Sequence, residues 1–135
     1  MKIAFPYKPF KSPLFGAVKR PVAKVDFWSN KFEKWVRYTL IVDTGADYTL
    51  LPAVASLDLG INLEKNCYQI ETFGIGGRET VYILKDKVPI KIGDYQEEIL
   101  LGILGRDGVP PLLGREECLN QFSLHFVNFQ TIFST

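Results

Sequence analysis

The sequence of 135 residues has few of the residue types on which most metal and nucleophilic sites depend. It contains two cysteines, Cys67 and Cys118, and one histidine, His125. Two cysteines cannot form a disulfide framework or a four-ligand zinc site, and one histidine leaves little for serine–histidine chemistry. Multi-histidine metal chemistry therefore has little to draw on, and we expect His125 to be an ordinary strand residue. The cysteines are expected to be small buried residues of a protein in a reducing, cytoplasmic compartment.

A charge excess of one sign and long apolar runs are also lacking. Sixteen Lys+Arg residues stand against fifteen Asp+Glu residues, so the net charge is +1. This balance gives no reason to expect nucleic acid or an anionic membrane as a partner. No apolar run approaches the roughly 20 residues that a membrane-spanning helix needs. Hydrophobic residues make up 47% of the chain, which is typical of one globular domain, and the length excludes two enzyme-sized lobes.

The chain from residue 20 to residue 127 favours β-structure. Three hairpins are expected, because apolar and polar residues alternate on either side of turn residues. They join residues 22–27 to 36–42, residues 68–72 to 80–84, and residues 88–92 to 98–104. A last strand is expected over residues 123–127. The pattern indicates an all-β domain with a barrel-like or folded-over sheet.

Two short helices are expected within this domain. The first covers residues 52–57 and ends at Gly60. The second lies within residues 115–122, where Cys118, Leu119 and Phe122 could share one helical face.

The ends of the chain are expected to lie outside the domain. Pro6, Pro9 and Pro13 fall within eight positions, and such spacing resists regular helix and strand. Residues 1–19 are therefore expected to form an arm that lies on the surface or wraps a partner. Residues 128–135 are expected to form a C-terminal extension.

The sharpest chemical feature is LIVDTGAD, residues 40–47. Asp43 follows a strongly apolar strand, where a charged carboxylate loses solvation. Gly45 allows a tight turn, and the Thr44 hydroxyl can hydrogen-bond close to the carboxylate. Such an acid is costly unless it is paired. Paired with a second carboxylate, one acid holds a proton, the other is ionised, and a water between them is activated.

This segment resembles the active-site loop of aspartic proteases, and specifically of the retropepsins, which are single-domain, retroviral-type proteases. Three further blocks match in the same order. Residues 19–22 (KRPV) resemble the basic-proline element, 73–77 (FGIGG) the flap tip, and 112–115 (LLGR) the hydrophobic–hydrophobic–glycine–arginine block. The resemblance implies an all-β, closed barrel-like retropepsin domain over residues 20–127. The insertion around residues 52–67 is similar to cellular retropepsin-like domains of bacteria.

The resemblance also implies how many chains an active site needs. Two-lobed aspartic proteases carry two Asp-Thr/Ser-Gly loops, and this chain carries one. A catalytic pair therefore requires Asp43 from each chain of a symmetric homodimer. The expected activity is that of an aspartic endopeptidase, with a peptide or protein substrate bound in extended form under a flap. The resemblance implies no metal and no organic cofactor.

Roles for other residues follow from the same resemblance. Asp43, Thr44 and Gly45 would form the catalytic loop, with Thr44 bracing the two loops across the dimer. Asp47 would pair with Arg115 of its own chain, and Arg20 would reach Asp47 of the other chain. The expected substrate-binding residues are Leu40, Ala46, Asp47, Gly74, Ile75, Gly76, Pro110 and Leu112.

Three other interpretations remain open at this point. The chain could be a retropepsin-like dimerisation or peptide-binding module without turnover. A metal-dependent hydrolase is a weaker alternative, because the sequence lacks the ligand spacings. Asp43 could also be a structural turn residue whose side chain caps the amides of Ala46 or Asp47.

Overall fold

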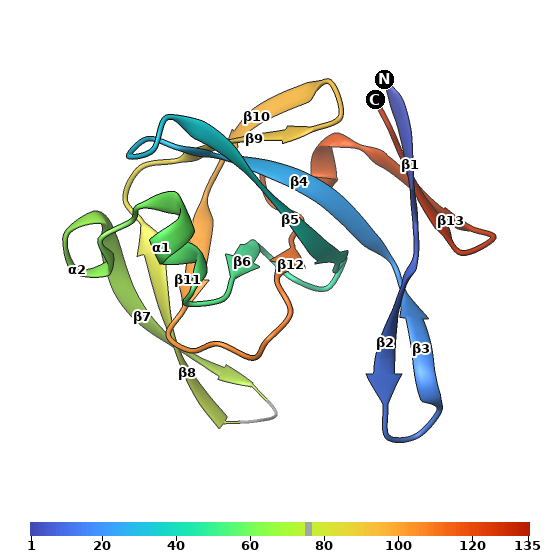
Figure 1. Ribbon diagram of the computed structural model, residues 1–135, viewed down its shortest axis with the longest axis horizontal. Coiled ribbons are helices and arrows are strands. Elements are labelled where there is room, and N and C mark those ends of the chain that lie inside the picture. The colour runs from blue at the N-terminus through green and yellow to red at the C-terminus, as the bar shows by residue number, and fades with distance from the viewer. Residues whose placement is uncertain (75–76) are drawn as a thin grey trace.

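The computed structural model describes residues 1–74 and 77–135, and most of them lie in strands (Figure 1). The strands are β1 (Lys2–Pro6), β2 (Lys8–Ser12), β3 (Gly16–Arg20), β4 (Val22–Ser29), β5 (Lys34–Val42), β6 (Thr49–Leu51), β7 (Cys67–Gly74), β8 (Gly77–Leu84), β9 (Val88–Ile92), β10 (Tyr95–Ile99), β11 (Leu101–Leu104), β12 (Leu112–Leu113), β13 (Ser123–Val127) and β14 (Gln130–Ser134). The helices are α1 (Ala55–Leu59), α2 (Leu63–Asn66) and the short 3-10 helix η1 (Leu119–Gln121). The expected all-β character is confirmed.

The described strands form a large open sheet and two small ones. The large sheet has nine strands in the order β10-β9-β4-β5-β12-β6-β11-β8-β7. Within the described residues its edge strands β10 and β7 do not pair, so the sheet does not close into the expected barrel. The small sheets are β1-β14-β13 and the hairpin β2-β3.

The three predicted hairpins are present in the sequence order expected. β4 pairs with β5, β7 with β8, and β9 with β10, each antiparallel. The prediction of one strand over residues 98–104 is wrong, because the chain breaks at Leu100. The Leu100 amide donates to Glu117 Oε1 at 2.9 Å instead of joining a strand ladder. After β10 the chain leaves β9, and β11 pairs with β6 and β8.

The helices agree with the sequence only in part. α1 ends at Gly60, as predicted, where a φ of 66° suits glycine. α2 was not predicted, although Asn62 caps it by accepting the amides of Glu64 and Lys65, both at 3.0 Å. Over residues 115–122 the expected helix is reduced to a turn and η1, because Glu117 takes a left-handed φ of 63° that no continuous helix accommodates.

The prediction that residues 1–19 resist strand formation is wrong. β1 pairs with β14, and β2 pairs with β3 through residues 8–20. The prolines do not prevent these strands, because β1 and β2 are edge strands that tolerate a missing amide. The two ends of the chain lie together, and the Met1 amino group donates to Thr135 Oγ1 at 2.8 Å (Figure 1).

β14 is the central strand of the terminal sheet, and it ties this sheet to the body. Phe133 on β14 is fully buried. Its ring meets those of Phe5 and Phe122 edge to face, with centroids 5.7 and 5.1 Å away. The core then continues through the inward faces of β4, β5, β9 and β11. Cys67 and Cys118 are free and buried in this core.

In the described part of the chain, no helix is both long enough and apolar enough to cross a membrane.

Candidate functional site

The loop after β5 is built over the end of another strand. β12 lies between β5 and β6, parallel to β5 through Leu112 and Ile41 and antiparallel to β6 through Leu112 and Leu50. The chain from Asp43 to Tyr48 must therefore pass over the end of β12 to join β5 to β6. Because neighbouring strands are about 4.8 Å apart, this loop bridges roughly 10 Å.

Backbone hydrogen bonds hold the loop to the chain that runs through β12. The Asp43 amide donates to the Leu113 carbonyl at 3.1 Å, and the Arg115 amide donates to the Ala46 carbonyl at 2.9 Å. The Glu116 amide donates to the Asp47 carbonyl at 2.8 Å. The loop is therefore fixed at its beginning and at its end by residues about 70 positions later in the sequence.

Gly114 is the point of closest approach between these two segments. A Cβ at this position would lie 2.3 Å from both the carbonyl carbon and the oxygen of Tyr48. The Gly114 amide donates to the fully buried Thr49 Oγ1 at 3.1 Å. Glycine is therefore required here by space, which gives the glycine of the LLGR block a physical reason.

The Asp43 side chain is half-buried and is held through one oxygen. Oδ1 accepts the Gly45 amide at 2.9 Å, and among the described residues no donor reaches Oδ2. The Ala46 amide bonds to the Asp43 carbonyl at 3.1 Å and not to its side chain. The carboxylate is thus oriented within its turn while one oxygen stays open to a water or a second acid.

Asp47 and Arg115 lie together, as the resemblance implies. Arg115 Nη2 donates to Asp47 Oδ1 at 2.5 Å. The Asp47 side chain is 75% exposed, so much of its surface is left for a further contact. The pKa of the adjacent Tyr48 is raised, first by burial and then by the negative charge of Asp47.

The apolar residues that are expected to bind substrate, Leu40, Pro110 and Leu112, are only partly accessible. Leu40 is fully buried in the core, whereas Ile41 is half-buried. Because alternate strand residues share a face, Ile41 lies on the face of Asp43, and Leu40 lies on the opposite one. Counting back two positions from Asp43 would have identified Ile41 from the sequence. Leu112 is half-buried and Pro110 is exposed, so both remain accessible.

Arg20 and Thr44 are the residues that the resemblance places across a dimer, and Arg20 is half-buried in this chain. Thr44 is exposed. The Arg20 guanidinium lies over the Phe10 ring of its own chain, 5.0 Å from the centroid. Ala46, two residues after Thr44, is half-buried.

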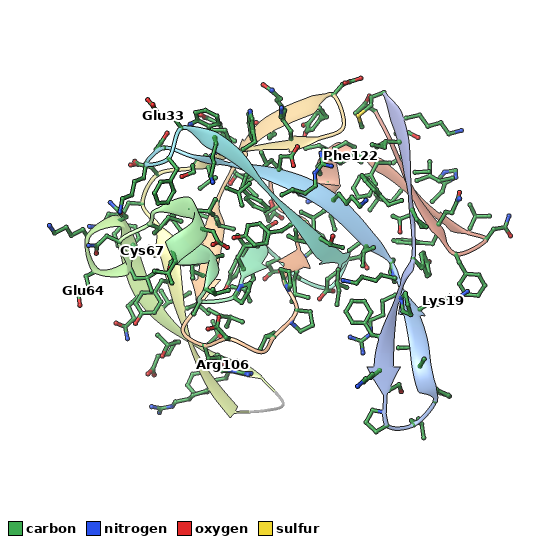
Figure 2. The ribbon with its side chains drawn as sticks, in the orientation of Figure 1. Lys19, Glu33, Glu64, Cys67, Arg106 and Phe122 are labelled. Carbon is green, nitrogen blue, oxygen red and sulfur yellow. The ribbon has the colours of Figure 1, made fainter. Side chains whose placement is uncertain are left out.

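The β7–β8 hairpin carries residues 73–77, which the resemblance assigns to a flap. Gly74 ends β7 and pairs with Gly77 at the start of β8. Ile75 and Gly76 lie outside the described residues. Arg106, labelled in Figure 2, connects the chain after β11 to this hairpin by donating to Glu79 Oε1 at 2.5 Å.

Thr49 is the functional-site residue that the sequence analysis missed most clearly. It is fully buried and holds the Gly114 amide, so it supports the crossing of the loop and β12. A threonine in a short strand carries no signal of this kind, because its partner is 65 positions away.

One comparison with solved structures bears on this arrangement. A crystal structure of a retropepsin-like aspartic protease from Rickettsia conorii matches 98% of this chain and 98% of its own, with a TM-score of 0.67 and 18% identity. The fold is that of a retropepsin-like aspartic protease. No family model matches the chain, and no curated protein matches it by sequence.

The retropepsin-like fold agrees with the resemblance that the motifs carry. At 18% identity the match concerns the course of the chain and not the role of any side chain. The roles of Asp43 and its neighbours must therefore be argued from the geometry of this chain.

Proposed function

We propose that this chain is an aspartic endopeptidase that acts as a symmetric homodimer. The observation that carries the proposal is the Asp43 carboxylate, which one backbone amide orients and which keeps its other oxygen open. It lies in a retropepsin-like fold, on a loop that is hydrogen-bonded to β12 and to the residues after it.

Two Asp43 side chains are needed because one carboxylate cannot perform both proton transfers. An ionised Asp43 would take a proton from a water as the water attacks the peptide carbonyl. The protonated Asp43 of the second chain would donate a proton to the carbonyl oxygen. Two carboxyl groups that share one site do not both ionise, because their like charges repel, and this is the known behaviour of aspartic-protease pairs.

The substrate would be a peptide in extended conformation between the β7–β8 hairpin and the loop that carries Asp43. Main-chain hydrogen bonds would supply much of the affinity. Gly45 and Asp47 are the expected partners of the peptide backbone on the loop, and Gly74 together with Ile75 and Gly76 on the flap. Ile41, Leu112 and Pro110 would favour apolar side chains near the cleaved bond.

Replacing Asp43 by asparagine tests the chemistry without removing the turn. The amide oxygen of asparagine can still accept the Gly45 amide, so the loop should keep its conformation. We expect Asp43→Asn to reduce peptide cleavage by at least about 10²–10⁴-fold, with unchanged thermal unfolding. Asp94→Asn, on the exposed β9–β10 turn, is the matched control and should retain full activity.

The outcomes separate the proposal from its alternative. Equal cleavage by purified Asp43→Asn and wild-type protein would overturn the mechanism. A wild-type chain that binds a statine-type transition-state mimic but cleaves nothing in a peptide library would indicate a binding module.

A further inference from the structure

The β2–β3 hairpin, residues 8–20, extends away from the body of the molecule (Figure 1). Among the described strands, β2 and β3 pair only with each other, and none of residues 8–20 is buried. At its tip, Leu14 is 81% exposed and Phe15 is 72% exposed. An isolated two-stranded hairpin is marginally stable in water, and an apolar tip on a protruding element is typical of an interaction surface.

The charge of the hairpin differs from that of the remainder of the chain. Residues 8–20 contain four of the sixteen basic residues and no acidic residue. The remaining residues therefore hold twelve basic and fifteen acidic residues, a net charge of −3. The near-neutral total conceals a basic hairpin and an acidic body, whose charges are complementary.

Within the hairpin, like charges face one another. Lys8 lies directly opposite Arg20 in the strand register, and Lys19, the next residue along β3, adds a positive charge on the other face. Cross-strand pairs of like charge are destabilising. Phe10 lies beside Lys8 and Arg20, with their charged groups 5.8 and 5.0 Å from its ring centroid. An acidic surface placed against the hairpin would relieve the repulsion that remains.

The hairpin leaves the body beside the candidate active site. The Pro21 carbonyl, one residue after β3, accepts the Val42 amide at 2.9 Å, and Val42 precedes Asp43. Lys19 marks this base in Figure 2, and its Nζ lies 4.8 Å from the Phe129 ring centroid. Five residues per strand give the hairpin a reach of about 17 Å. In a dimer that brings two Asp43 side chains together, the base of each hairpin is close to the two-fold axis.

We propose that the β2–β3 hairpin is a dimerisation arm, whose tip at Leu14 and Phe15 packs against the acidic body of a second copy of this chain. This inference rests on the homodimer of the proposed function and adds the structural element that stabilises that homodimer. The exposed apolar tip, the complementary charges of arm and body, and the position of the hairpin base beside Asp43 support it.

The test measures dimerisation separately from catalysis. Sedimentation equilibrium of the full chain in an Asp43→Asn background gives the dissociation constant of the dimer. We expect the double variant Leu14→Ser/Phe15→Ser to raise this constant about tenfold or more, because two apolar side chains lose their burial. The matched control is Leu57→Ser/Phe32→Ser, which removes two exposed apolar side chains from α1 and the β4–β5 turn. It should leave the constant unchanged.

A second variant tests the charges. Lys8→Gln/Lys11→Gln/Lys19→Gln should weaken the dimer at low salt and reduce the dependence of its dissociation constant on NaCl concentration. A dissociation constant equal to that of the control in both arm variants would overturn the arm. The arm would also be overturned if Leu14→Ser/Phe15→Ser, made with Asp43 intact, lost peptide cleavage while the dimer kept its stability. The tip would then contact substrate and not a second chain.

The result also separates the arm from the proposed function. An arm-dependent dimer that cleaves no peptide overturns the proposed function and leaves the arm. A wild-type dimer that cleaves peptides and does not respond to substitutions in the hairpin overturns the arm alone.

Discussion

Asp43 owes its position to the strand that precedes it and to the residues packed beneath its loop. The strand alternation places Asp43 on the face of Ile41, away from Leu40 and Val42, which are buried in the core. The sequence motif predicted the acid and its turn glycine. It did not predict Thr49, whose hydroxyl supports the loop from the next strand.

Thr49→Val should destabilise the protein by about 1–3 kcal/mol, because the shape is kept while the buried Gly114 amide loses its acceptor. Thr49→Ser is the matched control, since it keeps the hydroxyl and removes only a methyl group. Urea unfolding measures both, and peptide cleavage reports whether the loop has moved. Equal stability of the valine variant and the wild type would show that another acceptor replaces the hydroxyl.

At the scale of elements, the site depends on β12 passing between β5 and β6. These two strands are consecutive in the sequence, yet the loop between them is tied to residues 113–116. The approach is so close that Gly114 has no room for a side chain. The two segments therefore move or unfold as a unit.

Gly114→Ala should cost about 1–3 kcal/mol or more of stability, because its Cβ would lie 2.3 Å from the Tyr48 backbone, which cannot shift cheaply. Gly105→Ala provides the comparison, since its nearest neighbour, the Thr80 carbonyl oxygen, is 3.3 Å away. Thermal unfolding should rank wild type above Gly105→Ala and Gly105→Ala above Gly114→Ala. The reverse order of the two variants would contradict the close packing described here.

At the scale of the whole molecule, Glu117 joins distant parts of the sheet. Its left-handed backbone directs one oxygen to the Leu100 amide and the other to Lys87, which precedes β9. The hydrogen bond from Lys87, followed by that from Leu100, lowers the pKa of Glu117. The same contact raises the pKa of Lys87.

The signs of these shifts predict how stability depends on pH. The folded pKa of Glu117 lies below its ordinary value of 4.5, so its contribution is complete above about pH 4.5 and is lost as the pH falls through the folded pKa. The contribution of Lys87 is complete below its ordinary value of 10.5 and is lost at higher pH. Glu117→Gln should therefore lower the free energy of unfolding at pH 7 and approach the wild type at pH 3.

Urea titrations at several pH values between 3 and 7 measure this effect. Lys87→Met should also weaken the dependence of stability on pH between 3 and 7, because it removes the main cause of the lowered pKa of Glu117. The pair is partly exposed, so the effect of either variant should be modest. Parallel curves for Glu117→Gln and the wild type would contradict the assignment.

The sequence by itself determined the features that depend on near neighbours. The alternation of residues and the turn glycines predicted the three hairpins, and Gly60 predicted the end of α1. The Asp-Thr-Gly loop after an apolar strand predicted the candidate active site. In each case the local sequence already sets the deciding features. These are the alternation of apolar and polar side chains, the conformation of the turn and the solvation of the acid.

Tertiary structure alone decided what depends on distant partners. The insertion of β12 beside Asp43, the break at Leu100 and the sheet that joins the two ends of the chain all pair segments that are far apart in sequence. Local patterns show which edges and polar groups need a partner. Which partner they meet depends on the packing of the whole chain, and that packing orients Asp43 and leaves the β2–β3 hairpin outside the large sheet.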